Sequence, residues 1–169
     1  MLSRFLLIVF SLLVFASCNF KQHDSHVDEL KVEDLLRVAE QNIEKELTIS
    51  GRINHVCSHS GRRCFIVDST GEFSIRIEAA GEIENFGKEL MGNLIKVTGI
   101  LKENRLMASE IDEMANDVIA EHPSDAEPNG EHCSAEMTNI NKMRSWMKEH
   151  GKNYYSIFYI EGIRYELAE

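Results

Sequence analysis

The chain has 169 residues and a formal net charge of −10, from 18 Lys and Arg against 28 Asp and Glu. This length is enough for one well-packed core or two small ones. The acidic balance works against binding to nucleic-acid phosphates. The sequence also offers no Ser-His-Asp motif, phosphate loop or H-E-x-x-H motif. We therefore expect neither an enzyme nor a nucleic-acid-binding protein.

The N-terminal segment reads MLSRFLLIVFSLLVFASCNF, with Arg4 ahead of an apolar run over residues 5–16 that is short for a membrane span. It resembles the signal of bacterial lipoproteins, with Phe15 where leucine is usual. The resemblance implies that residues 1–17 are a removed signal peptide and that Cys18 carries the lipid, palmitate included, which anchors the chain. It places the mature chain outside the cytoplasm on a bacterial cell membrane, at the outer membrane, facing the periplasm or the surface. An ordinary signal peptide with an extra cysteine is the alternative.

Residues 18–31 form an acidic leader, and the periodic part of the chain begins after it. Apolar side chains at 32, 35, 36, 39 and 43 keep helical spacing, which predicts a short amphipathic helix over 32–46. Five strands are then predicted, with a helix or wound loop at 83–92 between the third and fourth: 47–57, 64–68, 73–80, 94–101 and 105–112. The inner face of the first strand is expected to carry Leu47, Ile49, Gly51, Ile53 and His55. Gly51 predicts a bulge or a sharp bend there.

Two stretches of this region resemble the OB-fold. GNLIKVTGILKENRLMASEI is similar to its last two strands, and LTISGRI is similar to its first. The resemblance implies a mainly β protein whose small five-stranded barrel domain covers residues 32–114, and a β-sandwich is the alternative. OB-folds bind oligonucleotides or oligosaccharides on one barrel face and its flanking loops. The resemblance therefore implies a binding module, with HVCSHSGRRC, including Arg62 and Arg63, as a ligand-binding loop.

The cysteines of this loop leave several chemistries open. Cys57 and Cys64 are spaced so that a short loop can bring them together as a disulfide. Alternatively, Cys57, His59 and Cys64 form a zinc or copper site, with Cys133 as the fourth ligand and His55 or His132 as substitutes. A thiol redox role is the third possibility, because Arg62 and Arg63 lie beside Cys64 and favour a thiolate.

The remainder is expected to form a linker and a small separate unit. Residues 115–132 are acidic and hold both prolines of the chain, which predicts a flexible linker. The unit at 133–169 is predicted to contain a helix that ends at Gly151 and a β-hairpin, 154–160 with 163–167, with its methionines and tyrosines used for packing.

We rank the resulting functions in a fixed order. The first is a membrane-anchored, extracytoplasmic lipoprotein that acts as a binding module and holds zinc or copper in the Cys/His loop. The alternative is a structural or interaction lipoprotein of the cell envelope, with a Cys57–Cys64 disulfide and a ligand or envelope protein on the barrel face. The thiol redox role comes third.

Overall fold

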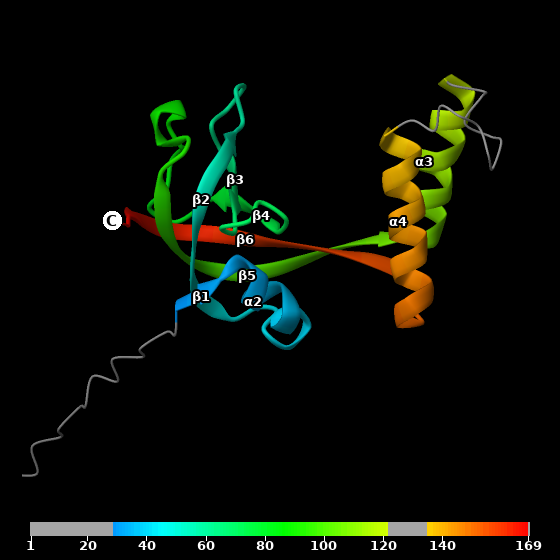
Figure 1. Cartoon of the computed structure of the whole chain (residues 1–169), viewed down its shortest axis with the longest axis horizontal. Helices are drawn as coiled ribbons and strands as arrows, with labels where there is room; N and C mark the ends of the chain where they lie inside the picture. The colour runs from blue at the N-terminus through cyan, green and yellow to red at the C-terminus, as the bar shows by residue number, and fades with distance from the viewer. Residues whose placement is uncertain (1–28, 122–134, 169) are drawn as a thin grey trace, which may run out of the picture.

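The computed structural model describes residues 29–121 and 135–168. The signal peptide, Cys18, His132, Cys133, most of the leader and most of the linker lie outside the described residues, so the predictions on them stay predictions. None of the described helices is long and apolar enough to cross a bilayer. Figure 1 shows a barrel from which two strands run out to a pair of helices.

Five strands close the barrel: β2 (Glu46–Val56), β3 (Arg63–Val67), β4 (Ser74–Ala79), β5 (Leu94–Met107) and β6 (Tyr154–Leu167). The order is β2-β3-β4-β6-β5, and β5 pairs back onto β2. All neighbours are antiparallel except β4 and β6, which run parallel. A five-stranded Greek-key barrel is the OB-type architecture. The predicted mainly β fold with a small OB-like barrel is therefore confirmed.

The predicted source of the fifth strand was wrong. Leu94–Met107 is one continuous strand, and the segment after it, Ala108–Glu121, is the helix α3. The closing strand is Tyr154–Leu167, which the sequence analysis split into a hairpin at Gly162. Gly162 lies inside the barrel wall, where a Cβ would come 2.9 Å from Ile77 Cγ2. Here the glycine permits close packing rather than a turn, and the segment at 133–169 is not a separate unit.

The barrel interior is filled by aliphatic side chains from alternate strand positions. Full burial of one such side chain contributes roughly 1.5–3 kcal/mol. α2 (Val32–Val38) adds Val32 and Leu35 to this core, and the short 3-10 helices η2 (Ala39–Gln41) and η3 (Lys88–Leu90) follow α2 and β4. The helix predicted over 32–46 is thus shorter than expected. The residues with at most 1% exposure in this core are Val32, Leu35, Ile49, Ile53, Cys64, Ile66, Ile77, Ile95, Val97, Leu101 and Ile160.

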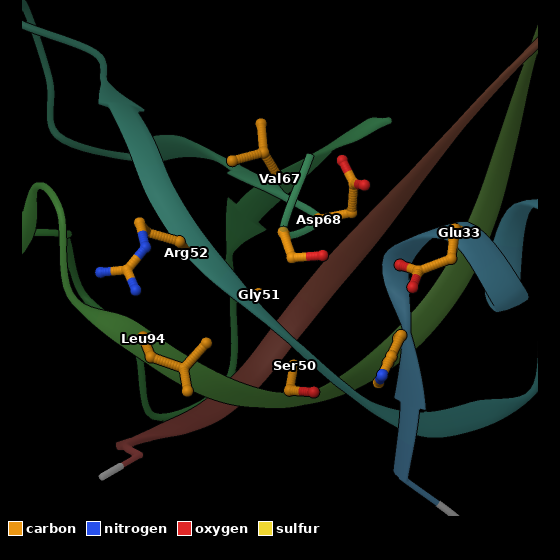
Figure 2. Close-up of a pocket in the computed structure, with 9 residues that line it drawn as sticks. Glu33, Ser50, Gly51, Arg52, Val67, Asp68 and Leu94 are labelled. Carbon is orange, nitrogen blue, oxygen red and sulfur yellow. The ribbon is translucent and has the colours of Figure 1, made fainter. Parts of the chain in front are cut away.

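β2 carries a bulge, and its position matters for the outer surface. The pairing with β3 runs Ile53 to Ile66 and then His55 to Phe65, so one extra residue stands on β2. The bulge turns His55 outward, whereas the sequence analysis placed it inward and placed the irregularity at Gly51. Gly51 instead allows close approach, since a Cβ there would lie 2.9 Å from the Val67 carbonyl oxygen. Figure 2 shows this part of β2 beside the short strand β1 (Glu29–Lys31).

β5 and β6 continue past the barrel as a two-stranded ribbon whose last registered pair is Met107 and Tyr154. The ribbon carries an antiparallel pair of helices, α3 and α4 (Ala135–His150), well away from the barrel (Figure 1). The helix predicted to end at Gly151 is confirmed. Its methionines pack as expected, in a second small core of Ile111, Ala115, Met137, Ile140 and Met147.

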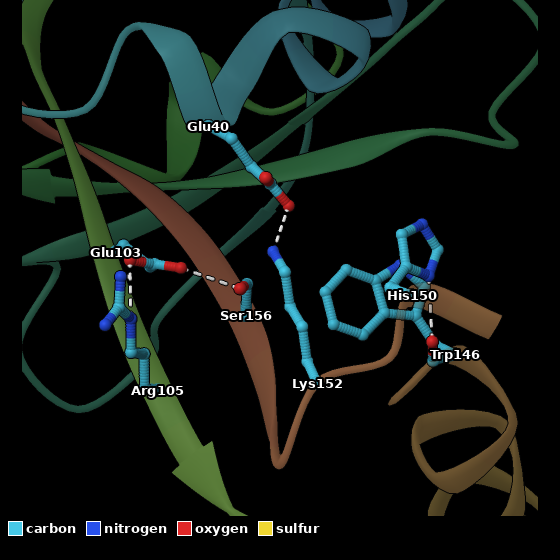
Figure 3. Close-up of polar contacts among 7 residues, drawn as sticks. All are labelled: Glu40, Glu103, Arg105, Trp146, His150, Lys152 and Ser156. Carbon is cyan, nitrogen blue, oxygen red and sulfur yellow. Dashed lines mark hydrogen bonds and ion pairs between the residues drawn. The ribbon is translucent and has the colours of Figure 1, made fainter. Parts of the chain in front are cut away.

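Polar contacts fix the ribbon where it leaves the barrel (Figure 3). The Lys152 ammonium pairs with the Glu40 carboxylate of η2 and lies 5.2 Å from the centre of the Trp146 ring. Ser156 Oγ donates a hydrogen bond to Glu103 Oε1 at 2.7 Å. These contacts join the base of the helix pair to the barrel.

Candidate functional site

The predicted ligand-binding loop connects β2 and β3 and is held at several points. Cys57 N–H donates to the Arg63 carbonyl at 2.9 Å, and Gly61 N–H donates to the Cys57 carbonyl at 3.0 Å. Phe86 N–H donates to the Gly61 carbonyl at 2.7 Å, which ties the loop to the segment after β4. Gly61 has a φ of 62°, a conformation that favours glycine. The loop is therefore well defined.

The register of β2 and β3 separates the two cysteines of the loop. Val56 pairs with Cys64, and both side chains are buried in the barrel core. Side chains alternate along a strand, so Cys57, which follows Val56, faces outward beside Arg63. Both thiols are free. The predicted Cys57–Cys64 disulfide is therefore not formed, because the two side chains lie on opposite sides of the barrel wall.

The predicted metal site is not assembled either. Within residues 29–121 and 135–168, no three His, Cys, Asp or Glu side chains lie where they could share a metal ion. Cys64 is fully buried among aliphatic side chains, and His59 is exposed on the loop. The residues of this loop thus do not fit a zinc or copper centre, and we derive no chemistry through a metal.

The two thiols differ strongly in acidity. Burial raises the pKa of the Cys64 thiol from its ordinary value of 9.0 to about 12. The pKa of the Cys57 thiol is lowered, first by the backbone N–H groups of His59 and Ser60, and further by the Ser60 hydroxyl and Arg63. The sequence analysis expected an activated thiolate at Cys64. The structure assigns that character to Cys57, because only this thiol is both accessible and surrounded by donors.

A hollow of about 320 Å³ lies next to Cys57. Its arginines are directed at the barrel wall. Arg62 Nη2 donates to the Ala79 carbonyl at 3.2 Å, and Arg63 Nε lies 3.4 Å from Glu78 Oε1. The complete lining is Cys57, Ser60, Arg62, Arg63, Glu78 and Ala79.

Iodoacetamide should alkylate Cys57 in the folded protein and should reach Cys64 only after denaturation. The reason is that thiolate and exposure coincide at Cys57, whereas the Cys64 thiol is buried and protonated. Intact mass before and after denaturant, on a chain with Cys18→Ser and Cys133→Ser, measures this. The matched control is the additional change Cys57→Ser, which should leave no site in the folded state. Equal labelling of both cysteines would contradict the register described above.

A row of large side chains crosses the outside of the barrel at right angles to the strands. His55 pairs with Phe65, Phe65 with Arg76, and Arg76 with Tyr159. The His55 and Phe65 rings are 5.9 Å apart, and the Arg76 guanidinium lies 4.8 Å from the centre of the Tyr159 ring. We call His55, Phe65, Arg76 and Tyr159 the outer row. It is a surface of three rings and one cation.

Ion pairs hold the arginine of the outer row in place. Glu78 Oε1 lies 3.3 Å from Arg76 Nε and 3.4 Å from Arg63 Nε. The buried Arg76 Nε–H makes no hydrogen bond within the described residues, so its contact with Glu78 is electrostatic. Two guanidinium groups therefore share one carboxylate, which leaves a local excess of positive charge on an acidic protein.

Sequence reasoning missed the outer row. It placed His55 inward and Tyr159 in a separate hairpin. The four residues come from four strands, and only the register of all four, together with the bulge on β2, aligns them. The outward aromatic residue in CFIVD was the one local signal.

The closed strand order and the exposed outer row define an OB-type barrel with a candidate ligand-binding face. No protein-family model matches the sequence, and no curated protein sequence matches it. Among solved structures, a chain described as an aspartyl-tRNA synthetase from Leishmania major Friedlin is similar, with a TM-score of 0.33 and 16% identity. The match covers 62% of this chain and 22% of that chain, so the present chain spans about a fifth of that protein's length. This likeness is too weak to carry an argument about function.

Proposed function

We propose that the protein is an extracytoplasmic, lipid-anchored binding module that binds an extended ligand along the outer row. The observation that carries this proposal is the alignment of three rings and a guanidinium in one register across β2, β3, β4 and β6. These side chains lie outside the barrel, where packing of the core does not require them. OB-type barrels use the corresponding face and its loops for oligonucleotides and oligosaccharides.

A saccharide fits the chemistry of this surface better than a nucleic acid. Flat rings provide stacking area, and guanidinium groups donate paired hydrogen bonds to oxygen acceptors. The whole chain carries a net charge of −10, which opposes the approach of a phosphate polymer. We therefore favour an oligosaccharide of the cell envelope, with a nucleic acid or an envelope protein as the alternatives that the experiment separates.

The anchoring part of the proposal rests on the lipoprotein-like signal that ends at Cys18. Eleven residues separate Cys18 from Glu29, where β1 begins. At roughly 3.3–3.6 Å per residue, this segment reaches at most about 40 Å. A lipid on Cys18 would hold the barrel close to the bilayer and present it to polymers at the membrane surface.

Phe65→Ala and Tyr159→Ala should each weaken saccharide binding by roughly ten- to a hundredfold, which corresponds to about 1.4–2.7 kcal/mol. Each change removes a ring from the outer row without touching the core. Isothermal titration of the full chain in detergent, with peptidoglycan and lipopolysaccharide fragments as probes, measures the effect.

The matched control is Phe73→Ala. Phe73 is an equally accessible ring, 41% exposed, but it lies on the β3–β4 turn outside the outer row. Its loss should leave saccharide affinity unchanged. If the saccharides fail to bind while a single-stranded oligonucleotide binds through Phe65 and Tyr159, the ligand class is wrong. If Phe73→Ala weakens binding as much as the other two changes, the site itself is wrong.

Thiol chemistry at Cys57 is a second candidate function. The specific observation in its favour is an accessible thiol whose pKa is lowered by backbone N–H groups. The alkylation experiment above tests it, and saccharide binding should be indifferent to Cys57→Ser.

A further inference from the structure

A second hollow, of about 230 Å³, opens beside β2 where its partner changes. β1 pairs in parallel with β2 at Thr48–Ser50, whereas β3 pairs with β2 from Arg52 onward. Gly51 lies between these two partners, so it contributes only backbone to the wall. Figure 2 shows the hollow between β2 and the start of α2. Its complete lining is Lys31, Glu33, Ser50, Gly51, Arg52, Val67, Asp68, Ser69 and Leu94.

Two of the four charged groups in this lining are already occupied. The Asp68 carboxylate accepts hydrogen bonds from Thr70 N–H, from Thr70 Oγ1 and from Phe73 N–H, so it organises the β3–β4 turn. Arg52 Nη1 donates to the Gly92 carbonyl on the other side of β2. Neither group needs a ligand.

The other two charged groups are uncommitted. Glu33 Oε2 is buried and has no hydrogen-bond partner within the described residues. Figure 2 shows the Glu33 carboxylate turned from α2 toward the hollow. The Lys31 ammonium likewise makes no ion pair or hydrogen bond with a described residue, and it does not pair with Glu33. A buried carboxylate oxygen without a donor is destabilising, and it indicates that something else supplies the donor.

We propose that this hollow binds a small zwitterion of amino-acid size, with its ammonium on Glu33 and its carboxylate on Lys31. A simple cation would be repelled by Lys31, and a simple anion would be repelled by Glu33, so both charges must be present on one ligand. The volume is below the roughly 300–1,000 Å³ of sites for drug-sized ligands. The Ser69 hydroxyl in the lining can donate to the bound carboxylate.

This site is separate from the outer row, so its test does not depend on saccharide binding. The full chain in detergent is titrated calorimetrically with free L-amino acids, one at a time. The best of them is then repeated as its methyl ester and as its N-acetyl form, each of which lacks one charge. We expect saturable one-to-one binding of the free amino acid, and at least tenfold weaker binding of both blocked forms.

Glu33→Gln and Lys31→Met should each lower the affinity tenfold or more while saccharide binding at the outer row persists. Lys31 is exposed, so its replacement is the variant that keeps the test valid should Glu33→Gln unfold. The matched control is Asp34→Asn, which removes an exposed carboxylate one position further along α2. The proposal is overturned by any of three results: no free amino acid binds, the blocked forms bind equally well, or both variants bind as the unaltered chain does.

Discussion

A chain cut after Glu121 should lose cooperative folding altogether. The cut removes β6, which pairs with β4 in parallel from Arg76 to Ala79 and with β5 from Ile95 to Met107. It also takes Ile160, which is fully buried, out of the barrel core. Truncating one such side chain costs about 2–5 kcal/mol, and losing a whole strand exceeds the 5–15 kcal/mol that is typical of total stability. Circular dichroism and thermal unfolding of the cut chain measure the loss.

The matched control removes the helix pair and keeps the strand. Met107 and Tyr154 face each other as the last pair of the ribbon, so an Asn-Gly turn can join them in place of residues 108–153. This chain should retain a cooperative transition, because the barrel and its core are complete without α3 and α4. A folded chain ending at Glu121 would instead support an independent domain at 32–114, as the sequence analysis expected.

The second large effect is expected in alkali. The Cys64 thiol has a pKa of about 12 in the fold and an ordinary value of 9.0. Its folded pKa is the higher one, so the stabilising contribution is complete below pH 9 and is lost as pH rises from 9 toward 12. Above pH 9 the unfolded chain releases this proton and the folded chain does not. The loss amounts to about 1.4 kcal/mol for each pH unit, and about 4 kcal/mol in total.

Urea unfolding at a series of pH values from neutral to strongly alkaline measures this slope. Cys64→Val removes the titrating group from the core and should flatten the decline, whatever its effect at neutral pH. Cys57→Ser should leave the decline unchanged, because the pKa of Cys57 is lowered rather than raised. If Cys64→Val declines as steeply as the unaltered chain, another group controls the alkaline stability.

The short strands were predictable because their signals are local. The runs at 64–68 and 73–80 alternate apolar and polar residues between turns, and they correspond to β3 and β4 within a residue or two. The helix before Gly151 was predictable for the same reason, from its spacing of methionines and isoleucine. In these segments burial and secondary structure have one period, so a single sequence is enough.

The long strands were not predictable in the same way. Lys102, Glu103 and Asn104 resemble a turn, yet they lie in the middle of β5, where the ribbon leaves the barrel and both its faces become polar. β6 was divided at a glycine that serves packing. Its place in the barrel depends on a parallel pairing with β4, far away in the sequence, and no local pattern reports such a pairing.

The candidate sites needed distances that a sequence does not contain. The spacing of Cys57 and Cys64 allowed a disulfide or a metal site, but the pairing of Val56 with Cys64 sends the two thiols to opposite sides of the wall. The outer row depends on the bulge that turns His55 outward. The orphaned oxygen of Glu33 becomes visible only when α2 is packed against β2.

The position of β6 in the chain also affects how the protein is made. Of the described strands it is the last to leave the ribosome, and until it does, β4 and β5 each keep an open edge. Exposed edges of this kind pair readily with other chains, and non-local strand pairing forms slowly. The nascent chain therefore passes through a stage with a half-built barrel, in which a holding chaperone that covers β4 and β5 would improve the yield of correctly folded protein.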